Sequence, residues 1–505
     1  MPLRGNVSTN TRLRRNAQAG AVFFVLIAIV LVATHFPILS MPYFWDELGQ
    51  FVPAGLDLWQ HGDWIPTTTL PNIHPPGIPL WLASVWTFTG HSIVATRISM
   101  LLLASAGAFL AFLLSLRLSA GVPGLPGFQV LLLLLLNPLF YTQAMMVQLD
   151  MPAMVFTLLA IYLFLEERRL MAVVACTILV WVKETGIVLP VVMGGVLFME
   201  KRKQEAWLFL IPCLSLLPWL LALWKSTGSI FGNREFATYN LSYPLHPARL
   251  FTAFLRRFFE LFVNHGYLLG AIPLALIWKR RQLYQHREWR FLCWFFVLHV
   301  VAVTVAGGAV LERYLLPVLP LTLIGFAYAW GFMPKHWRLG LPLATVVLSI
   351  AGFFMSSWFP QPHENDLSMV RLVDLFRITA RDASRHYPEQ RIATAWPLTD
   401  ALRRPDFGYV ETGLNITPMS DFSEEELRRV AQSKPDVFIW YTRDTLGNSW
   451  IFDYYPLLDR VRSEIYGWKP DDDFIGIQEI LGMQEVSRLS VGGESIAVFR
   501  RIRRQ

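Results

Sequence analysis

Charged residues are scarce in this chain. Only 16% of its 505 residues are charged, whereas 54% are hydrophobic, and a soluble core of this size cannot bury so much apolar side chain. Apolar stretches of about 20 residues recur, which is the length that an α-helix needs to cross a bilayer. They show no alternation of polar and apolar residues, which excludes a membrane β-barrel. The sequence predicts a mainly α-helical, polytopic transmembrane bundle of about eleven spans.

Cysteines and processing signals are also few. The three cysteines, Cys176, Cys213 and Cys293, all lie in apolar runs, so they predict no disulfide framework. The first apolar run, residues 21–39, has no A-x-A cleavage site after it, which favours an uncleaved membrane anchor over a signal peptide.

Lys and Arg residues of the apolar part of the chain gather in short connections. The net charge of +7 comes from Lys and Arg residues between apolar runs, which indicates membrane topology and no nucleic-acid partner. Residues 40–92 contain neither Lys nor Arg and are predicted to form a long external loop. Residues 170–200 are interpreted as two short spans joined by an outer turn, although a single tilted crossing stays possible from the sequence. The N-terminus is predicted to be cytoplasmic.

The composition changes near residue 360. Residues 1–359 are predicted to be the membrane domain, and residues 360–505, which are more polar, a small extracytoplasmic α/β domain. This domain is predicted to contain a helix over 366–386, strands at 391–396 and 436–441, and a hairpin over 488–501. A capping box is predicted at 423–426. The domain has no nucleotide-binding glycine fingerprint, so we expect it to recruit or shield a substrate.

Two acidic groups stand at predicted outer ends of spans. Asp46 and Glu47 follow the first span, and because neighbouring helical residues point about 100° apart, their carboxylates cannot face the same atom. Hydrated interfacial acids are the alternative interpretation. Asp150 precedes Met151 and Pro152 at the start of another span, where it is either a helix N-cap or a site residue.

Three basic groups lie on the same predicted side. His74 precedes Pro75, Pro76 and Gly77, a sequence that can start a helix along or into the membrane. Lys183 lies beside Glu184, and Arg313 lies beside Tyr314. Snorkelling of these side chains to the interface is the structural alternative, whereas ionisable groups at the hydrocarbon edge also mark functional sites.

Together, these segments resemble the C-type, membrane-embedded glycosyltransferases, especially the branch of protein O-mannosyltransferases and lipid A aminoarabinose transferases. The resemblance covers roughly residues 21–358, and it depends on the order and common side of five short motifs. These are Asp46-Glu47, His74-Pro75-Pro76-Gly77, Leu149-Asp150-Met151-Pro152, Lys183-Glu184, and the segment 313–320 that begins with Arg313-Tyr314.

The resemblance implies roles for the residues that match. Asp46 stands at the position of the catalytic base, Glu47 beside it, and Asp150 at the position of the second-loop acid. His74, Lys183, Arg313 and Tyr314 are expected to contact the donor phosphate. Relatives have an acidic-basic pair where this chain has Ile73-His74, and some have an arginine shortly after the acidic pair, where this chain has Leu48-Gly49.

The predicted reaction is transfer of a hexose or pentose from a polyprenyl-phosphate donor to a hydroxyl of a lipid, glycan or protein, at the outer face of the bacterial inner membrane. A single base implies inversion of the anomeric centre. No cofactor is assigned, and the sequence leaves open whether a divalent cation lies between carboxylates. A transporter or flippase and a non-catalytic assembly protein are the alternatives, although no internal repeat of the kind found in transporters is present.

Overall fold

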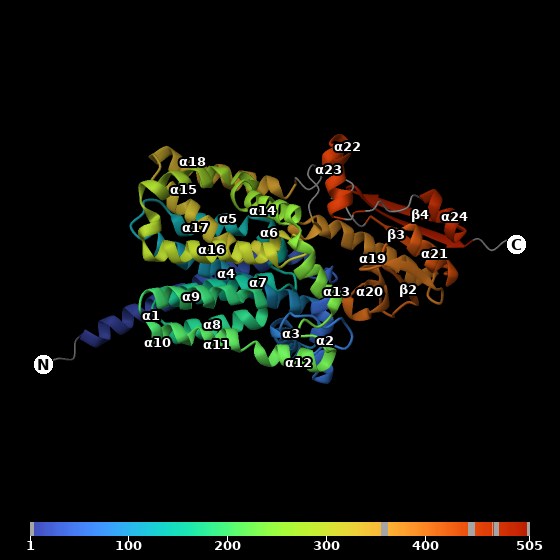
Figure 1. The fold of residues 1–505 in the computed structure, drawn as a ribbon, viewed down its shortest axis with the longest axis horizontal. Coiled ribbons are helices and arrows are strands. Elements are labelled where there is room, and N and C mark those ends of the chain that lie inside the picture. Colours follow the sequence, from blue (N-terminus) through green and yellow to red (C-terminus); the bar gives the residue numbers. More distant parts are fainter. Residues whose placement is uncertain (1–4, 355–361, 443–449, 467, 469–473, 502–505) are drawn as a thin grey trace.

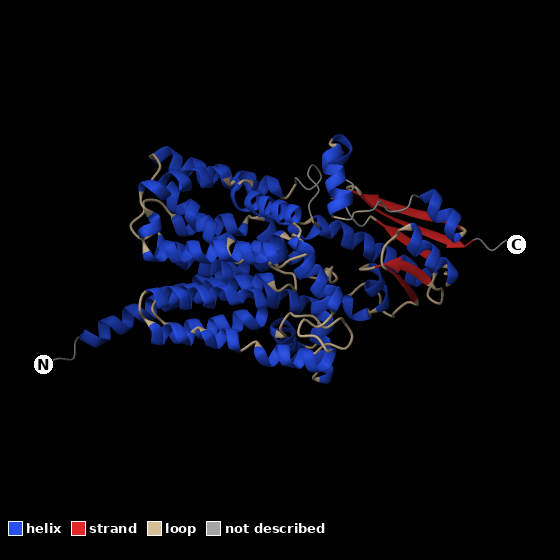
Figure 2. Cartoon of the chain, in the orientation of Figure 1, coloured by secondary structure: helices blue, strands red, loops and turns tan. Residues whose placement is uncertain are grey.

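A computed structural model describes residues 5–354, 362–442, 450–466, 468 and 474–501. Residues 5–354 form a helical bundle, and residues 362–501 form a C-terminal domain at one end of it (Figure 1). All strands belong to the C-terminal domain (Figure 2). The predicted boundary at 359/360, and the predicted end of the last span at Trp358, lie outside the described residues.

The bundle consists of long apolar helices and several shorter ones. In chain order they are α1 (Gly5–His35), α2 (Val52–His61), α3 (Gly77–Thr89), α4 (Ile93–Leu118), α5 (Pro126–Leu135), α6 (Pro138–Gln143), α7 (Asp150–Leu165), α8 (Arg169–Val182), α9 (Val188–Met199), α10 (Lys203–Leu208), α11 (Leu210–Leu214), α12 (Leu217–Thr227), α13 (Arg234–Ala237), α14 (Pro247–Phe262), α15 (Leu268–Arg280), α16 (Arg287–Val305), α17 (Leu319–Trp330) and α18 (Lys335–Gly352).

Among the described residues, four helical stretches are long and apolar enough to cross a membrane: Gln18–Ile38, Ile93–Leu118, Lys203–Thr227 and Arg287–Val305. Five shorter apolar helices accompany them. The mainly helical character with several apolar helices is thus confirmed, whereas the number of eleven spans stays a prediction.

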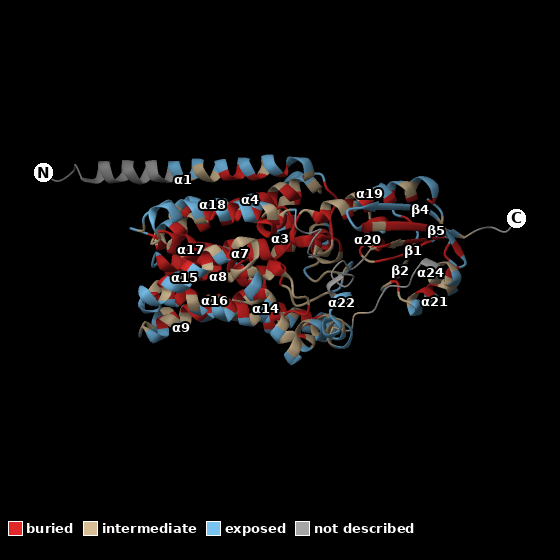
Figure 3. Cartoon of the chain, turned by 90° about the horizontal axis from the view of Figure 1, so that it is seen from above, coloured by how far each residue is buried: buried red, intermediate tan, exposed pale blue. Residues whose placement is uncertain are grey.

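The outer surface of the bundle is apolar. Helix α1 lies along one side (Figure 3), and many of the side chains described in it, from residue 18 on, are exposed; Val22, Leu26 and Ile29 are 60%, 52% and 57% exposed. A water-soluble protein rarely exposes so continuous an apolar face. This surface is suited to contact with lipid.

Residues 170–200 form two helices. Helix α8 ends at Val182, a 3₁₀ turn covers Glu184–Ile187, and α9 follows from Val188. The predicted pair of short helices joined by a turn is confirmed, and it places Lys183 in the turn.

Hydrophobic length predicts one span over about residues 129–145 and another over about residues 251–278, but both are interrupted in the structure. The stretch predicted over 129–145 breaks at Asn137 because the following proline disfavours helical geometry before it, and Asn137 caps α6 by accepting from Phe140 N at 2.8 Å. The stretch predicted over 251–278 breaks between α14 and α15, where His265 has a positive φ of 53°. Both predictions of one continuous helix were wrong.

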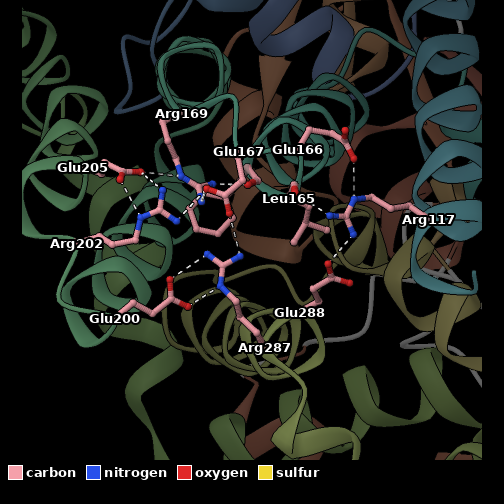
Figure 4. Close-up of polar contacts among 11 residues, drawn as sticks. Arg117, Leu165, Glu166, Glu167, Arg169, Glu200, Arg202, Glu205, Arg287 and Glu288 are labelled. Atoms are coloured by element: carbon pink, nitrogen blue, oxygen red, sulfur yellow. Dashed lines mark hydrogen bonds and ion pairs between the residues drawn. The ribbon is translucent and has the colours of Figure 1, made fainter.

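A network of ion pairs joins helix ends at one end of the bundle (Figure 4). Arg117 at the end of α4 contacts Glu166 and Glu288 at 2.8 and 2.6 Å, and Arg287 at the start of α16 contacts Glu200 at 2.6 Å. Further members are Glu167, Arg169, Arg202 and Glu205. Three of the basic connections between apolar runs, at residue 117 and over 166–169 and 201–203, thus meet at one end of the bundle, whereas their side of the membrane stays a prediction. Helix α7 has 16 residues and ends at this network with Leu165. Its first residue, Asp150, therefore lies roughly 24 Å from the network.

The C-terminal domain contains a mixed five-stranded sheet in the order β2-β1-β3-β5-β4. The strands are β1 (Ile392–Ala395), β2 (Ile416–Met419), β3 (Val437–Tyr441), β4 (Met483–Val491) and β5 (Glu494–Arg501). β1 pairs in parallel with β2 and β3, and β5 pairs antiparallel with β3 and β4. The helices are α19 (Ser368–His386), α20 (Leu398–Arg403), α21 (Glu424–Gln432), α22 (Trp450–Tyr454), α23 (Pro456–Arg460) and α24 (Phe474–Leu481).

The predicted helix, two strands and hairpin of this domain are confirmed, whereas β2 and α20 were not predicted. The predicted capping box is wrong in its contacts. Helix α21 does start after Ser423, but the Ser423 hydroxyl donates to Asp421 at 2.5 Å, and Glu426 accepts from Ser420 N at 3.1 Å. Because Asp421 binds the Ser423 hydroxyl, Ser423 and Glu426 do not form the reciprocal hydrogen bonds of a capping box.

Candidate active site

A cavity of about 530 Å³ lies at the end of the bundle that carries the C-terminal domain. Its wall is formed by the loops before α2, α3 and α7, the α8–α9 turn, the segment 303–314, and Trp396 of the C-terminal domain. Six of the seven residues predicted from the sequence line it: Asp46, His74, Asp150, Lys183, Arg313 and Tyr314. The seventh, Glu47, is not among the lining residues.

The backbone at Trp45 sends the two adjacent acids in different directions. Trp45 has a positive φ of 55°, a conformation that non-glycine residues adopt rarely and often at functional sites. A π-helical turn, Glu47–Phe51, follows directly. As a result, Asp46 contacts Arg313 at the cavity, whereas Glu47 points into the protein interior and contacts Arg97.

Glu47 is fully buried and its oxygens are satisfied. One oxygen accepts from Val147 N at 2.6 Å and from Arg97 Nη1. The other accepts from Phe44 N at 2.8 Å and from Arg97 Nη2 at 2.9 Å. These contacts tie the loop after α1 to α4 and to the loop before α7, which fixes the backbone that carries Asp46.

Arg313 is the centre of the charged groups. Its Nη2 donates to Asp46 Oδ2, its Nη1 donates to Glu364 Oε2, and its Nε lies 3.2 Å from Asp150 Oδ2. The side chain is only 5% exposed. An arginine so enclosed does not snorkel to water, and it brings the two predicted acids, Asp46 and Asp150, to one guanidinium group.

Lys183 completes this arrangement from the α8–α9 turn. Its Nζ donates to Asp150 Oδ1 and lies 4.1 Å from the centre of the Tyr314 ring, a distance suited to a cation–π interaction. Asp150 is the first residue of α7, and both of its oxygens face cations. The interpretation of Asp150 as a simple cap and of Lys183 as an interfacial lysine does not describe these contacts.

His74 reaches the cavity from the segment before α3. Its Nδ1 pairs with Glu184 Oε2 at 2.8 Å, which orients the ring and leaves Nε2 for a ligand. As predicted from the paired prolines, a helix starts here, at Gly77. A Cβ at Gly77 would lie 2.4 Å from the carbonyl oxygen of Trp181, so only glycine allows α3 to pack against the end of α8.

Solved structures of similar fold exist. The crystal structure of ArnT from Cupriavidus metallidurans bound to undecaprenyl phosphate matches with a TM-score of 0.55 and 14% identity, over 95% of this chain and 98% of that one. The apo form of ArnT from the same organism matches with a TM-score of 0.53 and 14% identity, over 96% and 98%. No family model and no curated protein matches the chain.

This chain has the ArnT fold. The likeness extends over the helical bundle and the C-terminal domain together, since 95% of the chain is covered. The predicted resemblance of the sequence to membrane-embedded glycosyltransferases is thereby confirmed at the level of the fold.

Within this ArnT-like fold, two residues near Arg313 and the cavity were missed from the sequence. Glu364 comes from the 3₁₀ turn His363–Asn365 that leads into α19, and it contacts Arg313. Trp396 follows β1 and lies against Trp45, with ring centres 4.9 Å apart. A Cβ at Gly49 would lie 3.1 Å from the Trp396 ring. The only signal in the sequence was that Leu48-Gly49 stands where some relatives have an arginine, which left open that another side chain lies against Gly49.

The donor set does not suit a divalent cation. Among the described residues, no group of three or more His, Cys, Asp or Glu side chains is placed to hold a metal ion. Asp46 and Asp150 already face Arg313, and Asp150 also faces Lys183. Hard divalent cations need several free oxygen ligands, so we derive no step through a metal.

Proposed function

We propose that this protein is an integral-membrane glycosyltransferase of the bacterial inner membrane. It moves a sugar from a polyprenyl-phosphate donor to an acceptor hydroxyl on the outer face. The observation that carries the proposal is the convergence of Asp46 and Asp150 on Arg313, with Lys183 bound to Asp150, in one cavity. The ArnT structure of the same fold was solved with undecaprenyl phosphate bound, which supports a lipid phosphate as the donor group.

The cations of the cavity suit a phosphate. Lys183 and Arg313 lie within contact of Asp150, and His74 lines the same cavity. A glycosyl phosphate leaves readily when positive charge neutralises the oxygen that gains an electron pair. Charge-assisted hydrogen bonds from these groups supply that charge. The Tyr314 ring beneath Lys183 holds the ammonium group in place.

Asp46 is the general base of the proposed reaction. The acceptor oxygen attacks the anomeric carbon, the bond from that carbon to the phosphate oxygen breaks, and the acceptor proton passes to Asp46. The polyprenyl phosphate leaves with the electron pair of the broken bond. A positioned base contributes on the order of 10²–10⁴-fold in rate. One displacement inverts the anomeric centre, in contrast to the double displacement of retaining glycosidases.

The neighbouring acids have other roles. Asp150 holds Lys183 and Arg313 at a fixed spacing through its two oxygens. Glu47, which is buried against Arg97, positions the turn that presents Asp46. Of the sequence-predicted acids, Asp46 is the most exposed to the cavity, with 17% of its side chain accessible, compared with 3% for Asp150.

Asp46→Asn tests the proposal. The asparagine keeps the size of the side chain but cannot take a proton, so transfer to the acceptor should fall by at least about 100-fold. Binding of undecaprenyl phosphate and thermal stability should change little. The measurement is product formation by mass spectrometry of envelope lipids and glycoproteins, in a deletion strain that carries either form.

Asp382→Asn is the matched control, because Asp382 pairs with His386 on the exposed side of α19. Normal transfer by Asp46→Asn would remove Asp46 from the mechanism. Movement of a lipid across reconstituted vesicles by the wild type, without formation of any glycosidic bond, would favour the transporter alternative.

A further inference from the structure

Glu364 joins the C-terminal domain to the charged centre of the cavity. It is 4% exposed, its Oε2 accepts from Arg313 Nη1, and its backbone carbonyl accepts from Gln143 Nε2 at 3.0 Å. It does not line the cavity. Glu364 therefore contacts Arg313 from the protein side, whereas Asp46 contacts it from the cavity side.

The turn around Glu364 is firmly held. Asn365 Nδ2 donates to Glu312 Oε2 at 2.7 Å, and Asp366 Oδ1 accepts from Ser368 N at 2.7 Å at the start of α19. His363 Nε2 lies 3.6 Å from Glu494 Oε1 at the start of β5. The turn that carries Glu364 is thus held by contacts with the bundle and with β5 of the C-terminal domain.

Three carboxyl groups converge on two cations. Asp46, Asp150 and Glu364 all contact the single guanidinium group of Arg313, whereas Lys183 contacts Asp150. If all three carboxyl groups were ionised, three negative charges would share one guanidinium group, and Glu364 Oε1 would carry charge in a buried place where it has no hydrogen-bond partner. Uncompensated buried charge is strongly unfavourable.

Among the described residues, the other nearby charged groups contact partners other than Glu364. Glu47 is paired with Arg97, and Glu312 is paired with Arg256. Arg257 donates to the carbonyls of Val303 and Leu311 at 2.6 and 3.3 Å.

We propose that Glu364 is a positioning residue that holds Arg313 in place from the C-terminal domain as a neutral carboxylic acid. This inference rests on the proposed function, because its purpose is to leave the charge of Arg313 available to the donor phosphate. A neutral acid keeps a hydrogen bond to Arg313 without competing with the phosphate for its positive charge. An ionised one would compete.

The surroundings of Glu364 favour the neutral form. Burial, together with the nearby Asp46, Asp150 and Glu47 carboxylates, raises the pKa of Glu364 to about 8 although Arg313 acts against the shift. The acid is therefore protonated at neutral pH and ionises as the pH rises through about 8. Above that pH the added negative charge lies beside Arg313, so binding of a lipid phosphate should weaken.

The test is the pH dependence of undecaprenyl phosphate binding to the full-length protein between pH 7 and 9.5. The charge of a phosphate monoester is nearly constant there, because its second pKa is about 6. The wild-type dissociation constant should rise on the order of tenfold across this range, from one added charge a few ångströms from the site. Glu364→Gln mimics the neutral acid and should bind as tightly at pH 9.5 as at pH 7.

Glu312→Gln is the matched control, because Glu312 is a neighbouring buried acid that contacts Arg256 and Asn365. Its pH profile should match that of the wild type. If Glu364→Gln weakens binding equally at every pH and keeps the wild-type profile, Glu364 is only structural and the inference is overturned. Wild-type binding that does not change with pH overturns it as well, while the proposed function stands.

Infrared spectroscopy of the wild type and of Glu364→Gln provides a second measurement. The wild type should show at pH 7 a carboxylic-acid carbonyl band that Glu364→Gln lacks and that disappears as the pH rises to 9.5, and identical bands in both proteins at pH 7 would overturn the inference. If the wild type binds no undecaprenyl phosphate at any pH, the proposed function fails and the inference fails with it.

Discussion

Replacing Glu47 by glutamine separates the roles of two adjacent carboxylates. Glu47 accepts hydrogen bonds from both terminal nitrogens of Arg97 and from two backbone N–H groups, with one pair of donors at each oxygen. A glutamine has only one acceptor oxygen, and its NH₂ group would face the other pair of donors. We therefore expect Glu47→Gln to destabilise the fold and to reduce transfer only as far as the fold is lost.

The magnitude follows from the burial of the pair. Both side chains are fully enclosed, with 0% of each exposed. A buried donor left without an acceptor costs about 1–3 kcal/mol, and loss of one partner of a buried ion pair costs about 3–5 kcal/mol. We expect the free energy of unfolding to fall by about 3–5 kcal/mol. The double variant Glu47→Leu/Arg97→Met should lose less, because it leaves no unpaired charge.

The assay is denaturant unfolding of the purified protein in bicelles, with transfer measured at a temperature where the variant is folded. Glu424→Gln is the control, because Glu424 and Arg428 form an exposed pair, 60% and 66% accessible, worth about 0.5 kcal/mol or less. The reasoning is refuted if Glu47→Gln unfolds like the wild type yet loses transfer as completely as Asp46→Asn. Glu47 would then belong with the reacting groups.

Two further predictions concern the C-terminal wall of the cavity and the opposite end of the bundle. Gly49→Leu should push Trp396 out of the cavity and raise the KM for the substrates, measured by initial rates. Gly195→Leu is the control and should not raise the KM, because no atom lies within 4 Å of a Cβ at Gly195. Equal KM values in both variants would contradict the role of Trp396. Arg287→Ala should lower the free energy of unfolding by about 1 kcal/mol or less, because its ion pairs are partly exposed. The transfer rate of the folded variant should be unchanged, and a large loss of rate would show that the ion-pair network affects the cavity.

Much of the fold was predictable because lipid imposes simple rules. The mainly helical character, the presence of several apolar helices and the break between α8 and α9 follow from hydrophobic length and charge. The interruptions at Asn137 and His265 were missed because the apolar composition continues through both. Such breaks are set by local caps and by neighbouring helices, which composition does not record.

The cavity was predictable where its residues lie in motifs with charges, as for Asp46, Asp150, Lys183 and Arg313. Glu364 and Trp396 were missed for a physical reason. They lie in a polar segment where an acid or an aromatic residue is ordinary, and only the packing of the C-terminal domain against the bundle brings them to Arg313 and Gly49. Contacts between distant parts of a chain carry no local pattern.

The strand order has a consequence for the biogenesis of the protein. β5 lies between β3 and β4, so the sheet is incomplete until residues 494–501 have been synthesised and paired. Trp396 directly follows β1, and Tyr441 of β3 donates to its carbonyl. A chain that ends before β5 would therefore contain all of its apolar helices but lack the complete sheet that carries Trp396 at the cavity. A truncation about 100 residues after Trp396 should thus abolish transfer as completely as a substitution of the base Asp46.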